Sequence, residues 1–177
     1  MPTFVALLRG VNVGKARRVP MADLRALLGD MGYTRVVTLL NSGNVVFHAA
    51  RGTAAKHATD IAAAIAGRLK VQAPIVVKTA RELVAIIQAN PIAAAEPDHP
   101  RLLVAFVQDA RKLPDLAVIE SLVVAPERFA LGKDAAYLLC ARGILESKAA
   151  AALLGKIGAA ATSRNWATVL KLQALAE

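Results

Sequence analysis

The sequence contains a single cysteine, Cys140, among 177 residues. A lone cysteine excludes a disulfide framework within the chain, and its position in an apolar run predicts a buried, unreactive thiol. The three histidines, His48, His57 and His99, have no second histidine or cysteine at the spacing of metal ligands. Paired carboxylates and the Gly-x-Ser-x-Gly motif of hydrolases are also absent. The sequence therefore predicts no metal site, no cofactor and no recognisable catalytic motif.

Aromatic and acidic residues are both scarce. Aromatic residues make up only 4% of the chain, and the aromatic signature of RNA-recognition sheets is missing, which argues against RNA binding by base stacking. Only 13 acidic residues oppose 22 Lys and Arg, so the formal charge is +9. A basic excess of this size attracts anions such as nucleic acid or phosphorylated metabolites, although it also serves simply to keep a protein in solution.

Long hydrophobic runs are missing as well, although 56% of the residues are hydrophobic. The longest uncharged stretch, residues 83–95, is about thirteen residues long, and a membrane span needs about 20. The first residues lack the basic and apolar pattern of a signal peptide. We therefore expect no membrane association and a cytoplasmic location, which the single cysteine also favours.

Hydrophobic periodicity in the first half predicts strands alternating with helices. The expected order is a strand at 3–9, a helix at 21–31, strands at 35–40 and 45–47, a helix at 53–69 and a strand at 74–78. The tetrapeptide Asn-Ser-Gly-Asn at 41–44 is typical of a hairpin turn between two strands. The βαββαβ order is that of a ferredoxin-like (split βαβ) fold. We therefore expect such a subdomain, together with a short helix at 80–88 that follows its last strand, over residues 1–95.

The second half resembles the first in element order. Its expected elements are strands at 102–107, 128–131 and 136–141, with helices at 116–122, 147–157 and 164–176. This βαββαα order predicts a second ferredoxin-like subdomain over 96–177, with its last strand replaced by a helix. The fold class expected from the sequence is therefore α+β, with two subdomains that meet near Asp98, His99 and Pro100.

The densest basic segment follows the first expected strand and contains four cations and no acid: Arg9, Lys15, Arg17 and Arg18. Gly10 and Gly14 allow backbone N–H groups to point toward an anion. The segment is not a nucleotide-binding P-loop, because its spacing is one residue short and Ala16 replaces the required hydroxyl residue. It is instead a candidate anion-binding loop, with an ordinary solvated loop as the alternative.

Topology predicts which polar residues lie near this loop. In the split order the first and third strands are adjacent and antiparallel, so the end of the first strand lies beside the 41–44 hairpin. Near the C-terminus, Thr162 or Ser163 is a suitable helix cap, and a polar stripe with the spacing i, i+4, i+7 follows. We hypothesise that Arg9 and Arg164 flank a shared anion pocket. The candidate ligand-binding residues are Arg9, Gly10, Asn12, Lys15, Ser42, Asn44, Arg164, Asn165, Thr168 and Lys171.

Four motifs in this order resemble the DUF1697 family: ALLRGVNVG at 6–14, MADLR at 21–25, NSGNVVF at 41–47 and SRNWAT at 163–168. The resemblance covers essentially the whole chain, and it departs at Lys15, where the family usually has glycine, and at Ala167, where it usually has asparagine. It implies a bacterial, cytoplasmic α+β protein of two related subdomains. It implies no activity and no catalytic residues, because the family is named for lacking an assigned function.

The sequence as a whole favours a protein that binds an anionic ligand, either nucleic acid or a phosphorylated metabolite. The expected site combines the loop at 9–12 with the hairpin at 41–44. Two alternatives remain open. One is a metal-independent enzyme that acts on a phosphate- or carboxylate-bearing substrate through Arg, Asn, Ser and Thr side chains. The other is a protein-interaction module that uses the apolar faces of its Ala-rich helices.

Overall fold

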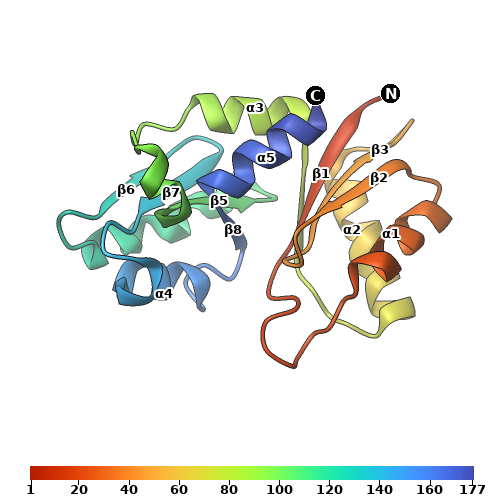
Figure 1. Ribbon diagram of the computed structural model, residues 1–177, viewed down its shortest axis with the longest axis horizontal. Coiled ribbons are helices and arrows are strands. Elements are labelled where there is room, and N and C mark those ends of the chain that lie inside the picture. The colour runs from red at the N-terminus through yellow and green to blue at the C-terminus, as the bar shows by residue number, and fades with distance from the viewer. The chain divides into compact units, whose positions relative to one another are not determined.

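The computed structural model describes residues 1–177, and the chain divides into two compact units. The first unit comprises Met1–Leu83 together with Leu172–Glu177, and the second comprises Val84–Lys171. The fold is a mixed α+β fold with two four-stranded antiparallel sheets (Figure 1). The boundary expected between residues 95 and 96 falls within the second unit, and the assignment of separate domains at that boundary stays a prediction.

The first unit follows the expected element order. Its elements are β1 (Thr3–Leu8), α1 (Met21–Asp30), β2 (Thr34–Leu39), β3 (Asn44–His48), α2 (Ala54–Ala64), a π-helical turn (Ile65–Leu69) and β4 (Ile75–Thr79). The strands are arranged β2-β3-β1-β4. The expected pairing of the first and third strands is confirmed, because β1 and β3 are antiparallel neighbours with Phe4 opposite Phe47.

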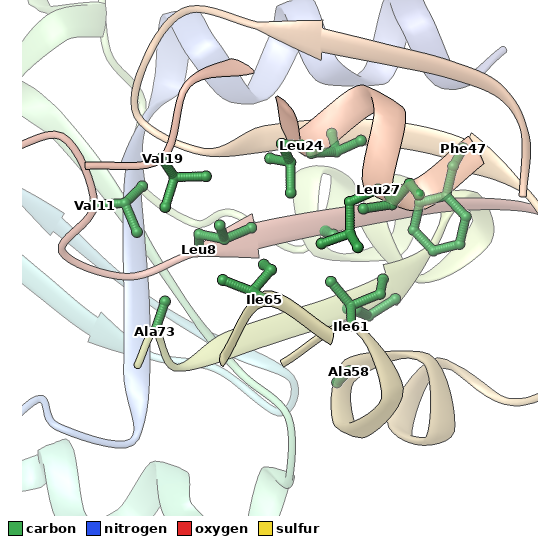
Figure 2. Packing of buried hydrophobic residues seen from close by; sticks show 14 of the residues in the cluster. Leu8, Val11, Val19, Leu24, Leu27, Phe47, Ala58, Ile61, Ile65 and Ala73 are labelled. Carbon is green, nitrogen blue, oxygen red and sulfur yellow. The ribbon is translucent and has the colours of Figure 1, made fainter. Parts of the chain in front are cut away.

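The core of the first unit lies between one face of this sheet and the helices α1 and α2. Alternate residues of β1 face this core, and among them Phe4 and Leu8 are buried. Leu24 on α1 and Ile61 on α2 are fully buried against the same face. Burying a side chain of this size contributes about 1.5–3 kcal/mol. Figure 2 shows the labelled members of this cluster gathered around β1.

The second unit repeats the same sheet order. Its elements are most of α3 (Ala80–Gln88), β5 (Leu102–Val107), a 3₁₀ helix (Ala110–Leu122), β6 (Arg128–Leu131), β7 (Ala135–Leu139), α4 (Lys148–Leu154), β8 (Ala161–Asn165) and the first part of α5 (Trp166–Ala176). The strands are arranged β6-β7-β5-β8. The helix expected at 116–122 is therefore a longer 3₁₀ helix, and the helix expected at 147–157 ends earlier, at Leu154.

The prediction that a helix replaces the last strand of the second half is wrong. Residues Ala161–Asn165 form the strand β8, which pairs antiparallel with β5 and places Ser163 opposite Ala105. Thr and Ser at this point favour a helix cap locally, but the backbone groups along the edge of β5 hold the segment extended. Helix α5 begins at Trp166. Its N-terminal cap is Asn165, whose Oδ1 accepts a hydrogen bond of 2.9 Å from the backbone N–H of Thr168.

The helices of both units are too short, or too polar, to cross a lipid bilayer.

Candidate functional site

The loop between β1 and α1 is anchored at both ends in the core of the first unit. Val11 and Val19 are 2% and 0% exposed, and Figure 2 shows both side chains directed toward Leu8. The residues between these two anchors are more exposed, including the cations Lys15, Arg17 and Arg18. Residues 12–18 therefore connect two buried valines, which restricts where this part of the loop can move.

Asn12 closes this loop through its side-chain amide. Its Nδ2 donates to the carbonyl oxygens of Val19 at 2.8 Å and Asn41 at 2.6 Å, and its Oδ1 accepts from the backbone N–H of Val19 at 2.8 Å. Asn12 adopts a left-handed backbone conformation with φ of 56°, and its backbone N–H donates to the carbonyl of Arg17. Both amide hydrogens of Asn12 are thus committed within the protein. The geometry makes Asn12 a residue that positions the loop.

The 41–44 hairpin lies beside the end of β1, as the topology predicts. The backbone N–H of Leu8 donates to the carbonyl of Gly43 at 2.9 Å. Gly43 has φ of +85°, and a Cβ there would lie 2.6 Å from the Cβ of Leu8. Asn44 is fully buried, and its Nδ2 donates to the carbonyl of Leu39 and to Ser42 Oγ, each at 2.9 Å. The polar side chains of the hairpin therefore stabilise the turn itself.

Two arginines, Arg9 and Arg17, contribute positive charge where β1 ends. Arg9 is half-buried, and its backbone N–H donates to the carbonyl of Pro74 at 2.8 Å. The guanidinium of Arg17 lies over Gly10, because a Cβ at Gly10 would be 3.3 Å from Arg17 Nη1. Burial and the positive charge of Arg17 both lower the pKa of Arg9. The electrostatic environment of Arg9 is therefore unfavourable to further positive charge.

Two cavities open beside the loop. One, of about 350 Å³, is lined by residues from the loop and from the segment before β4, namely Arg17, Gln72, Ala73 and Pro74. The other, of about 250 Å³, is lined by residues from the loop and the hairpin, namely Asn12, Arg18, Val19, Pro20 and Asn41.

The exposed cations of the loop, Lys15, Arg17 and Arg18, form no ion pair with a carboxylate. The ion pairs of the structure involve other cations.

The C-terminal candidates lie in the second unit and in a different local structure from the expected one. Arg164 is in β8, so it does not share a helical stripe with Thr168 and Lys171. Its Nη1 donates to the carbonyl of Ser163 at 2.9 Å, and burial lowers its pKa to about 10. Thr168 is buried, and its backbone N–H is held by the Asn165 cap. The hypothesis that Arg164 shares an anion pocket with Arg9 stays a prediction.

A buried histidine in the first unit was not singled out from the sequence. His57 on α2 is only 4% exposed, and its Nδ1 lies 2.8 Å from Tyr33 Oη. The rings of Phe4 and Phe47 pack edge-on against it. Its Nε2 is also buried, and burial lowers the pKa of this histidine. Burial among these aromatic rings therefore favours the neutral form of the His57 imidazole.

The thiol of Cys140 is fully buried, as the sequence predicts, and burial raises its pKa to about 11. A buried thiol with a raised pKa has little thiolate at neutral pH. The prediction that it is unreactive still awaits a measurement. No three His, Cys, Asp or Glu side chains are grouped so that they could hold a metal ion.

Sequence reasoning identified the basic loop but missed the residues that face it. Gln72 and Pro74 precede β4, which pairs directly with β1 on the side away from β3. Because β1 and β4 are antiparallel, the start of β4 must lie beside the end of β1. The predicted topology already contained this signal. The hydrogen bonds that the side chains of Asn12 and Asn44 form within the protein could not be predicted in this way. The local sequence around an asparagine in a loop does not show whether its amide binds the protein or a ligand.

The fold and the loop define a class of two-sheet α+β proteins with a basic loop after the first strand. A family model described as "Protein of unknown function (DUF1697)" matches residues 1–137, and the chain belongs to this family. The resemblance to this family is thereby confirmed over residues 1–137, whereas the motif at 163–168 lies outside the matched residues. A comparison with curated proteins finds no match.

Among solved structures, the chain is similar to the conserved bacterial protein SP0830 from Streptococcus pneumoniae. The two share 23% sequence identity over 99% of each chain, with a TM-score of 0.80. At this level of identity the likeness shows the fold alone.

Proposed function

We propose that the loop between β1 and α1 binds an anionic ligand through a phosphate group, carried by a phosphorylated small molecule or by nucleic acid. The observation that carries this proposal is the position of the Arg17 guanidinium, which lies over Gly10, the residue after Arg9, and whose charge lowers the pKa of Arg9. Two neighbouring guanidinium groups repel each other. A phosphate bound beside them removes this repulsion and accepts charge-assisted hydrogen bonds from both.

The anchoring of the loop at its two ends also supports the proposal. Val11 and Val19 fix its ends in the core, and the amide of Asn12 ties it to the hairpin. A ligand that binds a loop already held in one conformation loses less ordering entropy than one that binds a flexible loop. Asn12 and Asn44 contribute to binding in this indirect way, whereas Arg9, Lys15 and Arg17 supply the charge.

We further propose that each unit is a ferredoxin-like subdomain, with the binding site at one end of the first sheet. The sheet orders β2-β3-β1-β4 and β6-β7-β5-β8 support this assignment. In such a sheet the end of β1 is flanked by the start of β3 and the start of β4. A loop that leaves β1 therefore has polar backbone on both sides. A cytoplasmic location, where phosphorylated metabolites and nucleic acid are abundant, is part of the same proposal.

Thermal unfolding in the presence of phosphate compounds tests this function. We expect inorganic phosphate, pyrophosphate and nucleotides to raise Tm at constant ionic strength, by the equivalent of about 2.7 kcal/mol at a ligand concentration 100 times Kd. Arg17→Asn should remove about 1.5 kcal/mol of this stabilisation, the low end for a charged hydrogen bond because Arg17 is exposed. Asparagine tolerates the left-handed conformation of Arg17, where φ is 50°.

Arg51→Gln is the matched control, because Arg51 is an exposed arginine of the first unit outside the loop. It removes the same charge and should leave the phosphate effect unchanged. If no phosphate compound stabilises the wild-type protein, or if Arg51→Gln weakens the effect as much as Arg17→Asn, the proposed function is wrong. Salt dependence separates the two ligand types, since nucleic acid binding weakens much more steeply with added salt.

A further inference from the structure

Arg17 and Arg18 are consecutive residues, yet they line different cavities. Arg17 lines the cavity of about 350 Å³ beside the segment that precedes β4. Arg18 lines the cavity of about 250 Å³ beside the hairpin. Gln72 contributes to the first cavity and Asn41 to the second, and no residue is common to the two. The two arginines thus contribute to two separate cavities, one beside the segment that precedes β4 and one beside the hairpin.

The backbone conformation of the loop explains this divergence. Arg17 is in the left-handed region with φ of 50°, which is unfavourable for a residue with a side chain and turns the chain sharply at this point. The backbone N–H of Asn12 donates to the carbonyl of Arg17 at 3.0 Å, and the side chain of Asn12 fixes Val19 just beyond. Strained backbone of this kind is concentrated in segments that hold ligands. Here it is maintained by hydrogen bonds from a single asparagine.

We propose that the two cavities receive two separate phosphate groups of one ligand, with Arg17 binding one and Arg18 binding the other. This inference rests on the proposed function and specifies its ligand class. A single phosphate occupies only the Arg17 side, where Arg9 adds a second positive charge. A ligand with two phosphates on different atoms places one phosphate in each cavity. That chemistry occurs in nucleoside bisphosphates and in successive phosphates of a nucleic acid strand.

The charge distribution of the loop is consistent with two phosphates. No acidic residue lies between Arg9 and Arg18, and neither Arg17 nor Arg18 forms an ion pair within the protein. A guanidinium binds phosphate through two parallel N–H donors, so each arginine suits one phosphate group. The amide hydrogens of Asn12 are already used. Asn12 therefore has no amide donor left for a phosphate, and the arginines supply the charged contacts.

Isothermal titration calorimetry with three probes tests the inference: inorganic phosphate, a nucleoside 3′,5′-bisphosphate and a short single-stranded oligonucleotide. We expect the bisphosphate to bind wild-type protein at least about tenfold more tightly than inorganic phosphate, because it gains a second charged contact. Arg18→Gln should weaken the bisphosphate about tenfold and leave inorganic phosphate unchanged. Arg17→Asn should weaken both probes, and Arg51→Gln should weaken neither.

The outcomes separate this inference from the proposed function. If inorganic phosphate binds through Arg17 but Arg18→Gln changes no probe's affinity, the two-phosphate inference is overturned and the proposed function survives. If no probe binds, both fail. If the oligonucleotide binds in an Arg18-dependent manner and the bisphosphate does not, the inference holds and the two phosphates belong to a nucleic acid strand. Arg17→Gly replaces Arg17→Asn if the latter does not fold, because glycine adopts positive φ freely.

Discussion

Replacing Asn12 with aspartate gives the sharpest test of how the basic loop is held. The substitution keeps the shape of the side chain and the acceptor for the backbone N–H of Val19. It removes the two donors that reach the carbonyls of Val19 and Asn41 at 2.8 and 2.6 Å. Each lost hydrogen bond costs about 0.5–1.5 kcal/mol, so the two together cost about 1–3 kcal/mol. A carboxylate oxygen facing two carbonyl oxygens adds repulsion.

Urea denaturation at pH 7 measures this loss as a shift of the midpoint at constant slope. The cost should shrink below about pH 4, where an aspartate side chain becomes protonated and regains one donor. Asn41→Asp is the matched control, because it makes the same chemical change at an exposed side chain of the neighbouring hairpin. It should change the free energy of unfolding by less than about 0.5 kcal/mol.

The reasoning is refuted if Asn12→Asp and Asn41→Asp have the same small effect. A loss of stability that is equally large in acid would also count against it, since the repulsive carboxylate is then not the cause. Asn12→Gly separates the backbone from the side chain, because glycine tolerates the φ of 56° but makes no side-chain hydrogen bonds. It should be about as destabilising as Asn12→Asp at pH 7.

Three further predictions concern the cores of the two units. Burial lowers the pKa of His57 below 6.5, so the unfolded chain binds a proton that the folded chain does not. Stability should therefore fall as the pH drops from about 6.5 toward the folded-state pKa, and His57→Phe should flatten that part of a pH–stability profile. Tyr137→Phe should cost about 1–2 kcal/mol in urea unfolding, because it removes the buried 2.6 Å hydrogen bond to the carbonyl of Ile86. Cys140 should react with a thiol reagent only in denaturant, and rapid labelling of the native protein would contradict its burial.

Much of the fold could be predicted from the sequence, because hydrophobic periodicity is strong in both halves. The hydrophobic runs that form β1, β5 and α3 have clear ends in the sequence. The first and last residues expected for these three elements agree closely with those in the structure. The element order then places the end of β1 beside the start of β3. These features depend on local pattern and simple topology, which a single sequence contains.

The strand β8 could not be predicted in the same way. Its sequence, Ala-Thr-Ser-Arg-Asn, contains hydroxyl residues that typically precede a helix, and its apolar alternation is weak. It is a strand because it pairs with β5, and Ala161 and Thr162 are buried against that neighbour. Strand propensity depends on such cross-strand packing more than on the residues themselves. The helix cap consequently moves to Asn165.

The position of the candidate site follows from the sheet more than from any motif. Because β1 lies between β3 and β4, the loop that follows β1 has the hairpin on one side and the segment before β4 on the other. The sequence places cations in that loop, and two consecutive ones, Arg17 with its left-handed backbone and Arg18, line different cavities. In the proposed site, the asparagine that closes the loop is therefore as important as the arginines, because its hydrogen bonds hold the segment that carries them.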